Sequence, residues 1–121
     1  MSLTVLTVDD SRTMRDMLNL TLTSAGFRVI QAEDGIDGLQ VLEQETPHVI
    51  ITDINMPKLD GFGFIEELRQ TERWRSVPIL VLTTESDAAK KVRARSAGAT
   101  GWIVKPFDAV KLIDAVRRVA A

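Results

Sequence analysis

Three acidic residues, a threonine and a lysine stand directly after apolar segments of this sequence. Asp9 and Asp10 follow residues 3–8, Asp53 follows 49–52, Thr83 follows 79–82, and Lys105 follows 102–104. A carboxylate at the end of an apolar segment is unfavourable unless it is paired. Crowded carboxylates need a cation, and either Lys105 or a divalent ion can serve. Because these ligands offer oxygen without any His or Cys, the ion that they select is a hard one such as Mg²⁺.

Part of this pattern has a simpler explanation in ordinary local structure. Asp and Ser are common helix N-caps, so residues 9–11 also suit the start of a helix. Taken alone, Thr83 is an ordinary residue for a strand end and Lys105 an ordinary loop lysine. A purely structural role is harder to assign to Asp53, because it places a charge at the end of an apolar strand. The combination at four segment ends favours one shared site. The backbone carbonyl of Asn55 can add a further oxygen to it.

The segments that position these residues alternate between two patterns. Short apolar runs predict strands over 3–8, 27–32, 49–52, 79–82 and 102–104. Longer segments with helical spacing predict helices over 12–25, 35–45, 61–71, 87–97 and 112–120. This alternation predicts an α/β fold, a (βα)5 doubly wound parallel sheet with helices on both faces.

The order of the strands follows from how apolar each one is. The first, third and fourth are the most apolar, so we expect them at the centre, whereas Arg28 and Gln31 mark the second as an edge strand. This gives the order 2-1-3-4-5. Ligands of such sheets bind beyond the carboxyl ends of the strands, where the strand order reverses. His48 precedes the third strand, so we expect it far from that rim.

Length and composition exclude several classes of protein. The chain has 121 residues, 45% of them hydrophobic, no Cys, and a formal net charge of -2. This composition argues against disorder, against thiol chemistry, and against non-specific binding of nucleic acid. No apolar run approaches the length of a membrane span. We expect one cytoplasmic, monomeric domain over residues 1–121, without an output domain.

Two local features carry expectations of their own. The predicted helix over 87–97 has a thin apolar side, made of Ala88, Ala89 and Val92, and carries several cations. We therefore expect it to be the least firmly packed helix, and its cations suit either a solvated face or a surface for a partner. Trp74 is expected to lie in a loop.

A set of short motifs, in order along the chain, resembles the receiver domains of two-component response regulators. They are Val8-Asp9-Asp10-Ser11, Thr52-Asp53-Ile54-Asn55-Met56-Pro57, Asp60-Gly61, Leu82-Thr83 and Val104-Lys105-Pro106-Phe107. Each motif alone is weak, but their order and spacing over residues 3–119 are specific. The resemblance implies the flavodoxin/CheY-like fold, whose strand order is the one expected above.

The resemblance also assigns an acceptor and a metal site. Asp53 would accept the phosphoryl group as an acyl phosphate, a reaction for which a carboxylate is a competent nucleophile. Asp10, Asp53 and the backbone carbonyl of Asn55 would hold Mg²⁺. Asp9 would support the ion through its water shell.

Further roles around the acceptor come from the same resemblance. Lys105, before a peptide bond to Pro106 that is usually cis in the family, would contact the phosphoryl group. The hydroxyl of Thr83 would turn toward that group once it is attached, and Asn55 and Glu85 would tune its lifetime. The position that usually carries Tyr or Phe ahead of the lysine is Trp102. Its larger indole, with a donor-only N–H, puts inward rotation of this switch residue in doubt.

Partners follow from the type of receiver. Residues 9–15 look most like the CheY type of chemotaxis regulator, which implies a histidine kinase as phosphodonor and a flagellar motor switch protein as target. A phosphatase is a further implied partner, whereas nucleic acid and membrane are not. The chain would catalyse only its own phosphorylation and slow dephosphorylation. Phosphorylation would shift an equilibrium at the face formed by the fourth helix, fifth strand and fifth helix.

Other functions fit the residues less well. A flavodoxin-like cofactor protein needs a phosphate cradle after the first strand, where this chain has two carboxylates. A carboxylate-nucleophile phosphatase places its nucleophile there with a second Asp two residues on, whereas Asp9 and Asp10 are adjacent. A degenerate receiver acting as a binding module is opposed by the intact set of Asp10, Asp53, Thr83 and Lys105. A phosphate sink remains open.

Overall fold

Strands buried on both faces build the centre of the molecule. In the computed structural model, which describes residues 3–121, the strands are β1 (Thr4–Val8), β2 (Arg28–Ala32), β3 (Val49–Thr52), β4 (Ile79–Thr83) and β5 (Gly101–Val104). They form one parallel sheet in the order β2-β1-β3-β4-β5. Every residue of β1, β3 and β4 is buried, whereas β2 and β5 are only partly buried. The predicted fold class and strand order are confirmed.

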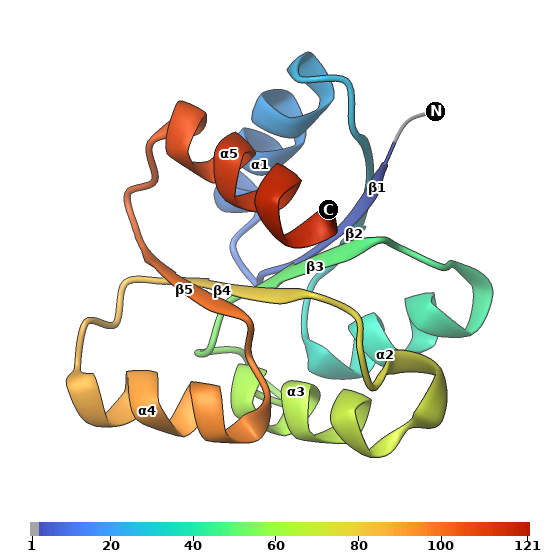
Figure 1. Cartoon of the computed structure of the whole chain (residues 1–121), viewed down its shortest axis with the longest axis vertical. Helices are drawn as coiled ribbons and strands as arrows, with labels where there is room; N and C mark the ends of the chain where they lie inside the picture. The colour runs from blue at the N-terminus through green and yellow to red at the C-terminus, as the bar shows by residue number, and fades with distance from the viewer. Residues whose placement is uncertain (1–2) are drawn as a thin grey trace.

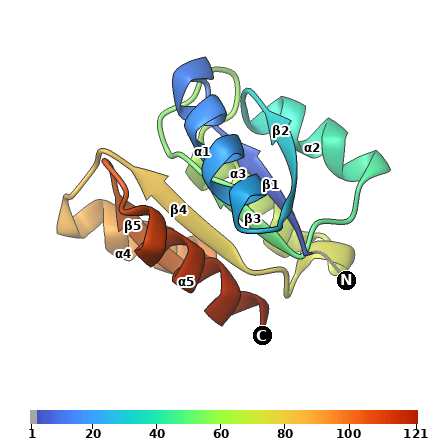
Figure 2. The same cartoon turned by 90° about the horizontal axis from the view of Figure 1, so that it is seen from above.

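Helices cover both faces of this sheet (Figures 1 and 2). They are α1 (Arg12–Ser24), α2 (Gly35–Gln44), α3 (Gly61–Gln70), α4 (Ala88–Ala97) and α5 (Ala109–Ala120), with a short 3-10 helix at Glu72–Trp74. α1 and α5 pack on one face, and α2, α3 and α4 on the other. Among residues 3–121, none of the helices combines the length and the apolar character that crossing a membrane requires.

Side-chain caps fix where these helices begin. Each of the five α-helices starts after a residue whose side chain accepts a hydrogen bond from a backbone N–H of the first turn. These N-caps are Ser11, Asp34, Asp60, Asp87 and Asp108. Such caps satisfy N–H groups that have no partner within the helix. Because each helix follows a strand, the capped ends gather at the carboxyl edge of the sheet.

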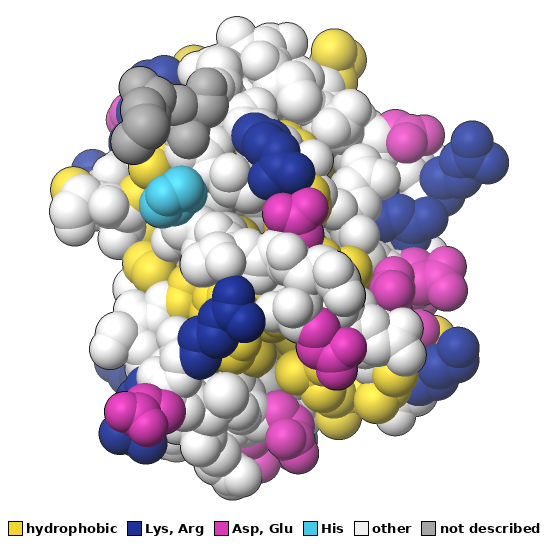
Figure 3. Space-filling model, turned by 90° about the vertical axis from the view of Figure 1, so that its right-hand side faces the viewer, with side chains coloured by type: hydrophobic (Ala, Val, Ile, Leu, Met, Phe, Trp, Pro, Cys, Tyr) yellow, Lys and Arg dark blue, Asp and Glu magenta, His cyan; other side chains and the backbone are white. Residues whose placement is uncertain are grey.

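The opposite edge holds the only histidine of the chain. His48 Nδ1 accepts a hydrogen bond from the backbone N–H of Thr4 at 2.9 Å, at the amino end of β1. His48 therefore lies far from the carboxyl ends of the strands, as expected. The face on which this histidine appears mixes acidic and basic side chains (Figure 3).

Two expectations about local packing are wrong. α4 buries Ala94, while Ala88, Ala89 and Val92 are all exposed. Val92 lies two residues from Ala94, about 200° around the helix, so the two cannot face the same neighbour. Trp74 is not in an open loop: it ends the 3-10 helix, is 7% exposed, and packs into the core on the α3 side of the sheet.

A glycine at the start of α3 allows the loop after β3 to pass close by. The backbone N–H of Gly61 donates to the carbonyl of Ile54 at 2.8 Å. A Cβ at position 61 would run into the carbonyl oxygen of Asp53 and lie 2.8 Å from Ile54 Cα. Both obstacles are backbone atoms, which cannot move aside as a side chain does. The loop that carries Asp53 thus depends on a residue without a side chain.

We predict that Gly61→Ala lowers the free energy of unfolding by about 1–3 kcal/mol, the usual cost of overpacking. Gly63→Ala is the matched control in the same turn, because its Cβ would meet only the end of the Leu59 side chain. Urea unfolding of both variants and the parent measures the difference. Equal stability of the two variants would contradict the predicted clash with the Asp53 loop.

Candidate functional site

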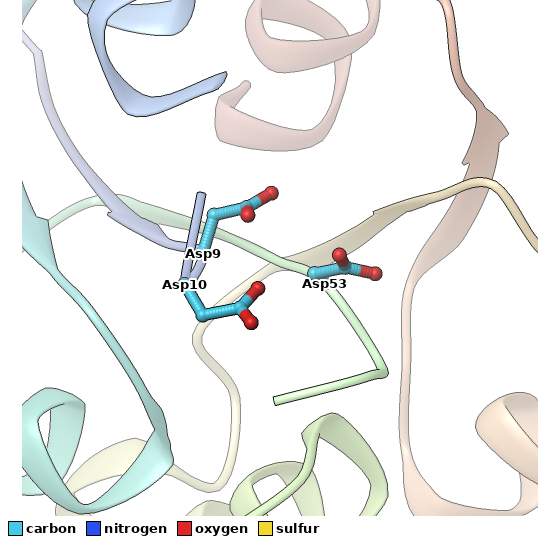
Figure 4. A group of neighbouring side chains, drawn as sticks. All are labelled: Asp9, Asp10 and Asp53. Carbon is cyan, nitrogen blue, oxygen red and sulfur yellow. The ribbon is translucent and has the colours of Figure 1, made fainter. Parts of the chain in front are cut away.

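The ends of β1 and β3 bring three carboxylates together. Val8 pairs with Thr52 in the sheet, so the residues that follow the two strands are neighbours. Asp9 and Asp10 come from β1 and Asp53 from β3, and one carboxylate oxygen of each lies within 4.8 Å of the others. Figure 4 shows the three side chains pointing the same way from the strand ends. Within residues 3–121, this is the one group of three or more His, Cys, Asp or Glu side chains close enough to share a metal ion.

A lysine from the far side of β4 reaches into this group. Lys105 Nζ donates to Asp9 Oδ2 at 2.8 Å and to Asp53 Oδ2 at 3.0 Å. Its own backbone N–H donates to the carbonyl of Thr83 at 2.8 Å, and its bond to Pro106 is cis. Burial by itself would lower the pKa of Lys105, but the hydrogen bonds and charges of the two carboxylates outweigh it and raise the pKa. The ammonium therefore stays charged beside them.

Asp9 and Asp10 are adjacent in the sequence but differ in their exposure to solvent. Asp9 is 2% exposed, and its carboxylate accepts hydrogen bonds from the Ser11 N–H at 2.9 Å and from Lys105. Asp10 is exposed, and within residues 3–121 its carboxylate forms no hydrogen bond or ion pair. Asp10 can therefore offer its oxygens to a cation without sharing them with an existing contact, whereas both oxygens of Asp9 already accept a hydrogen bond.

Asp53 is held from two sides. Its Oδ1 accepts a hydrogen bond from the Ile54 N–H at 2.6 Å, and its Oδ2 accepts one from Lys105. The residue is 8% exposed, so its carboxylate is fixed in direction at the rim of the sheet. A buried carboxylate is tolerated when it is paired in this way.

The other predicted site residues come from the loop after β3, from the end of β4 and from β5. Thr83 is fully buried at the end of β4, and its hydroxyl accepts a hydrogen bond from the Glu85 N–H at 3.3 Å. Asn55 Nδ2 donates to Glu85 Oε1 at 3.0 Å. Trp102 lies on β5, pairs with Val81, and packs against the core shared with α3 and α4. The structure therefore places Trp102 away from the three carboxylates.

Two contacts at the site were not found from the sequence. The guanidinium Nη1 of Arg15 donates a hydrogen bond to the backbone carbonyl of Asp9 at 2.7 Å. Lys90 of α4 pairs with Glu85 at 3.1 Å. Hydrogen bonds from Asn55 and Lys90, together with the charge of Lys90, lower the pKa of Glu85. No motif marks either cation, because both contacts depend on how a helix is placed against a loop.

The comparisons with known proteins identify the family. The family model described as "Response regulator receiver domain" matches residues 5–117. The chain belongs to the response regulator receiver family. Receiver domains are signalling modules of two-component systems that interact with histidine kinase phosphodonors.

Curated relatives of this receiver are of two kinds. It is 40% identical over 115 residues to a "Probable transcriptional regulator ycf27" of Guillardia theta, covering 95% of this chain and 44% of the relative. It is 37% identical over 116 residues to a "Probable chemotaxis protein CheY" of Rhizobium etli, covering 95% of this chain and 90% of that one. The receiver thus spans about half the length of the transcriptional regulators that it matches.

Solved structures with the same fold include a chemotaxis protein and a kinase-linked receiver. The chemotaxis response regulator CheY4 of Vibrio cholerae has a TM-score of 0.92 and 41% identity, over 98% of this chain and 99% of that chain. The receiver domain of the sensor histidine kinase PA1611 of Pseudomonas aeruginosa has a TM-score of 0.91 and 28% identity, over 99% and 98%. That domain is described with a magnesium ion coordinated in its active-site cleft.

We predict that Asp10→Asn raises the free energy of unfolding in EDTA by about 0.5–1 kcal/mol. The reason is that removing one of several crowded like charges relieves repulsion of this size. Asp16→Asn is the control, because Asp16 is exposed on α1 and outside the acidic group. Urea unfolding measures both variants. An Asp10→Asn variant no more stable than the parent would show that the carboxylates do not repel one another in the folded receiver.

Proposed function

We propose that this receiver accepts a phosphoryl group on Asp53 from a phosphohistidine of a histidine kinase, and signals by binding a protein partner when phosphorylated. The observation that carries the proposal is the Lys105 ammonium shared between Asp9 and Asp53, beside the uncommitted carboxylate of Asp10. This arrangement supplies a fixed nucleophile, a fixed positive charge and open oxygen ligands at one rim.

The donor set at this rim fits a magnesium ion. Asp10 and Asp53 provide carboxylate oxygens, and the backbone carbonyl of Asn55 is the proposed third protein ligand, with Asp9 acting through the water shell. Oxygen ligands without His or Cys suit Mg²⁺. When bound, the ion would neutralise charge on the phosphoryl oxygens during transfer. The magnesium described for the related receiver of PA1611 supports this choice of metal.

The side chains of the receiver account for the covalent step. A carboxylate oxygen of Asp53 forms a bond to phosphorus while the phosphorus–nitrogen bond of the phosphohistidine breaks, and that electron pair stays on the imidazole nitrogen. The Ile54 N–H and Lys105 hold the carboxylate in direction before the reaction. Lys105 then moves its hydrogen bond from Asp53 to a phosphoryl oxygen, which needs no proton transfer. Positioning and charge neutralisation are what phosphoryl transfer chiefly requires.

The same site also accounts for the loss of the phosphoryl group by hydrolysis. Water attacks phosphorus, the bond to Asp53 breaks, and inorganic phosphate leaves. Asn55 and Glu85, joined at 3.0 Å beside the acceptor, stand where they can tune the approach of that water. The receiver in this proposal catalyses its own phosphorylation and dephosphorylation, and turns over no other substrate.

The proposed signal starts at Thr83 and Trp102. The Thr83 hydroxyl would leave the Glu85 N–H and donate to a phosphoryl oxygen. Trp102 Nε1 is buried and has no hydrogen-bond partner within residues 3–121. A buried N–H without an acceptor is unfavourable, so a rearrangement that supplies one favours the active form. The indole of Trp102 already packs against the core. The proposed signal therefore does not depend on the inward rotation expected of a Tyr or Phe at this position.

A chain of polar contacts extends the signal to α4. Asn55 follows the acceptor, its amide binds Glu85, and Glu85 pairs with Lys90 in the first turn of α4. α4 packs on the core through the buried Ala94 and the partly buried Ala97. In addition, the guanidinium of Arg93 lies 4.0 Å from the centroid of the Phe62 ring. A change at the acceptor loop can therefore reach a helix that is lightly held.

The proposed pathway is chemotaxis, in the cytoplasm, with a flagellar motor switch protein as target and a phosphatase as a further partner. Similarity to CheY proteins over nearly their whole length supports it. Equally similar transcriptional regulators support no particular target, because this receiver matches only half of each. The alternative is a phosphate sink, or a degenerate receiver that acts as a binding module.

We predict that acetyl phosphate with Mg²⁺ adds one phosphoryl group to the receiver and that Asp53→Asn abolishes the addition. Intact-protein mass spectrometry measures the product, and omission of Mg²⁺ tests the metal. Asp60→Asn is the control, since it changes a nearby acid outside the acidic group and keeps an N-cap side chain. A phosphorylated Asp53→Asn variant would show that the acceptor lies elsewhere.

We predict that beryllofluoride, a phosphoryl mimic, tightens binding to a flagellar motor switch protein by about tenfold, a typical coupling between sites. Lys91→Glu on α4 should weaken that binding, whereas Arg12→Glu on α1 should not. Fluorescence anisotropy with a labelled switch peptide measures both. No binding in either state, with phosphorylation of Asp53 intact, would contradict the motor target and favour the phosphate sink.

A further inference from the structure

The peptide group between Asp9 and Asp10 is held from several directions. The Asp9 N–H donates to the carbonyl of Ala32 in β2 at 3.1 Å, and the carboxylate of Asp9 is bound by Ser11 and Lys105. The carbonyl of Asp9 is bound by Arg15. Every polar group of Asp9 thus has a partner, while the next side chain, Asp10, has none within residues 3–121.

Arg15 forms the contact that bears most directly on Asp10. Its Nη1 donates to the Asp9 carbonyl at 2.7 Å, a short hydrogen bond from a charged donor. That carbonyl belongs to the peptide plane that ends at the Cα atom of Asp10, so its direction helps to set where the Asp10 side chain leaves the backbone. The other contacts of Asp9 involve its N–H or its side chain. Of the contacts of Asp9, only the one with Arg15 is made to an atom of this peptide plane.

The first turn of α1 and the edge strand β2 hold Arg15 itself in place. Its backbone N–H donates to the carbonyl of Ser11 at 3.0 Å, and its own carbonyl accepts from Gln31 Nε2 of β2 at 3.3 Å. The side chain is partly buried and lines a cleft with residues of β2 and the following loop. The guanidinium is therefore presented to the Asp9 carbonyl by two elements of the fold.

We propose that Arg15 is a positioning residue for the magnesium site, acting by fixing the Asp9–Asp10 peptide so that the Asp10 carboxylate faces Asp53. This inference rests on the proposed function, since it concerns the metal site on which phosphorylation depends. Arg15 does not touch the ion in this proposal. It orients a ligand in the way that outer hydrogen bonds orient the ligands of other metal sites.

The sign of the effect separates positioning from simple electrostatics. Arg15 is a cation close to a group of carboxylates that attracts a divalent ion. If only its charge mattered, removing it would raise the affinity for Mg²⁺. If it positions Asp10, removing it lowers the affinity in spite of the lost positive charge. The two explanations therefore predict opposite changes in one measured quantity.

The test is isothermal titration of the full chain with MgCl₂, with thermal unfolding recorded for each variant. Arg15→Met should weaken Mg²⁺ binding by about tenfold, as loss of an outer hydrogen bond does elsewhere. Arg12→Met is the matched control, because Arg12 is an exposed cation of the same helix whose side chain forms no hydrogen bond within residues 3–121. It should leave affinity unchanged or slightly higher. Arg15→Lys, which keeps the charge and one donor group, should be intermediate.

A double variant tests the route of the effect. In a chain that already carries Asp10→Asn, Arg15→Met should change the residual affinity little, because the ligand that it positions is gone. A full additional loss there, or an Arg15→Met affinity equal to or above that of the parent, overturns the proposal. If Arg15→Met does not fold, Arg15→Lys decides: affinity at least twofold weaker supports the proposal, and parent affinity overturns it.

Failure of the proposed function gives a different result. If Mg²⁺ affinity is insensitive to Asp10→Asn and Asp53→Asn, the metal site itself is wrong, whatever Arg15 does. If affinity depends on both carboxylates but not on Arg15, the site stands and only the positioning role of Arg15 is lost.

Discussion

The Lys105 ammonium shared by Asp9 and Asp53 is the interaction on which the rest of this site depends. Three carboxylates from two adjacent strands lie within 4.8 Å of one another, an arrangement that is unfavourable without a cation. Lys105 neutralises one of the three charges and leaves two, which is the charge that a single divalent ion matches. Because β5 lies next to β4, Lys105 reaches across the end of β4 to contact Asp9 after β1 and Asp53 after β3.

Asp9 and Asp10 are buried to different extents, and this suits them to different roles at the site. Asp9 is closed into the structure by Ser11 and Lys105, so it contributes charge and rigidity. Asp10 is exposed, so it can bind a ligand at little cost in desolvation. A pair of equally buried aspartates would be more costly to fold, and a pair of equally exposed ones would be poorly oriented. The site therefore gains its order from Asp9 and its open oxygens from Asp10.

Much of this could be predicted from the sequence because it depends on properties that single segments display. The continuous apolar runs of β1, β3 and β4 identify the central strands, and parallel strands necessarily bring Asp9, Asp10 and Asp53 to one rim. The burial of Trp74 was missed because the residue stands between charged neighbours, Arg73 and Arg75, and the guanidinium of Arg73 lies over its ring. The buried side of α4 was missed because alanines occur on several sides of that helix, so none stands out as apolar. The contacts of Arg15 and Lys90 were missed because they join residues that no periodic pattern links.

In the proposed function, the light attachment of α4 would allow a small chemical change at Asp53 to alter the surface of the receiver. One ion pair of α4 is largely exposed, and exposed ion pairs contribute little to stability. Its apolar contacts with the core come from alanines, the buried Ala94 and the partly buried Ala97, whose side chains offer little apolar area. A phosphoryl group brings about two negative charges and three acceptor oxygens to the rim that Asn55 and Glu85 line. Because the contacts that hold α4 are weak, interactions of ordinary size between that group and one α4 arrangement would be enough to shift the population toward that arrangement. A more deeply packed α4 would hold its place and would leave the chemistry at Asp53 without an effect on the surface.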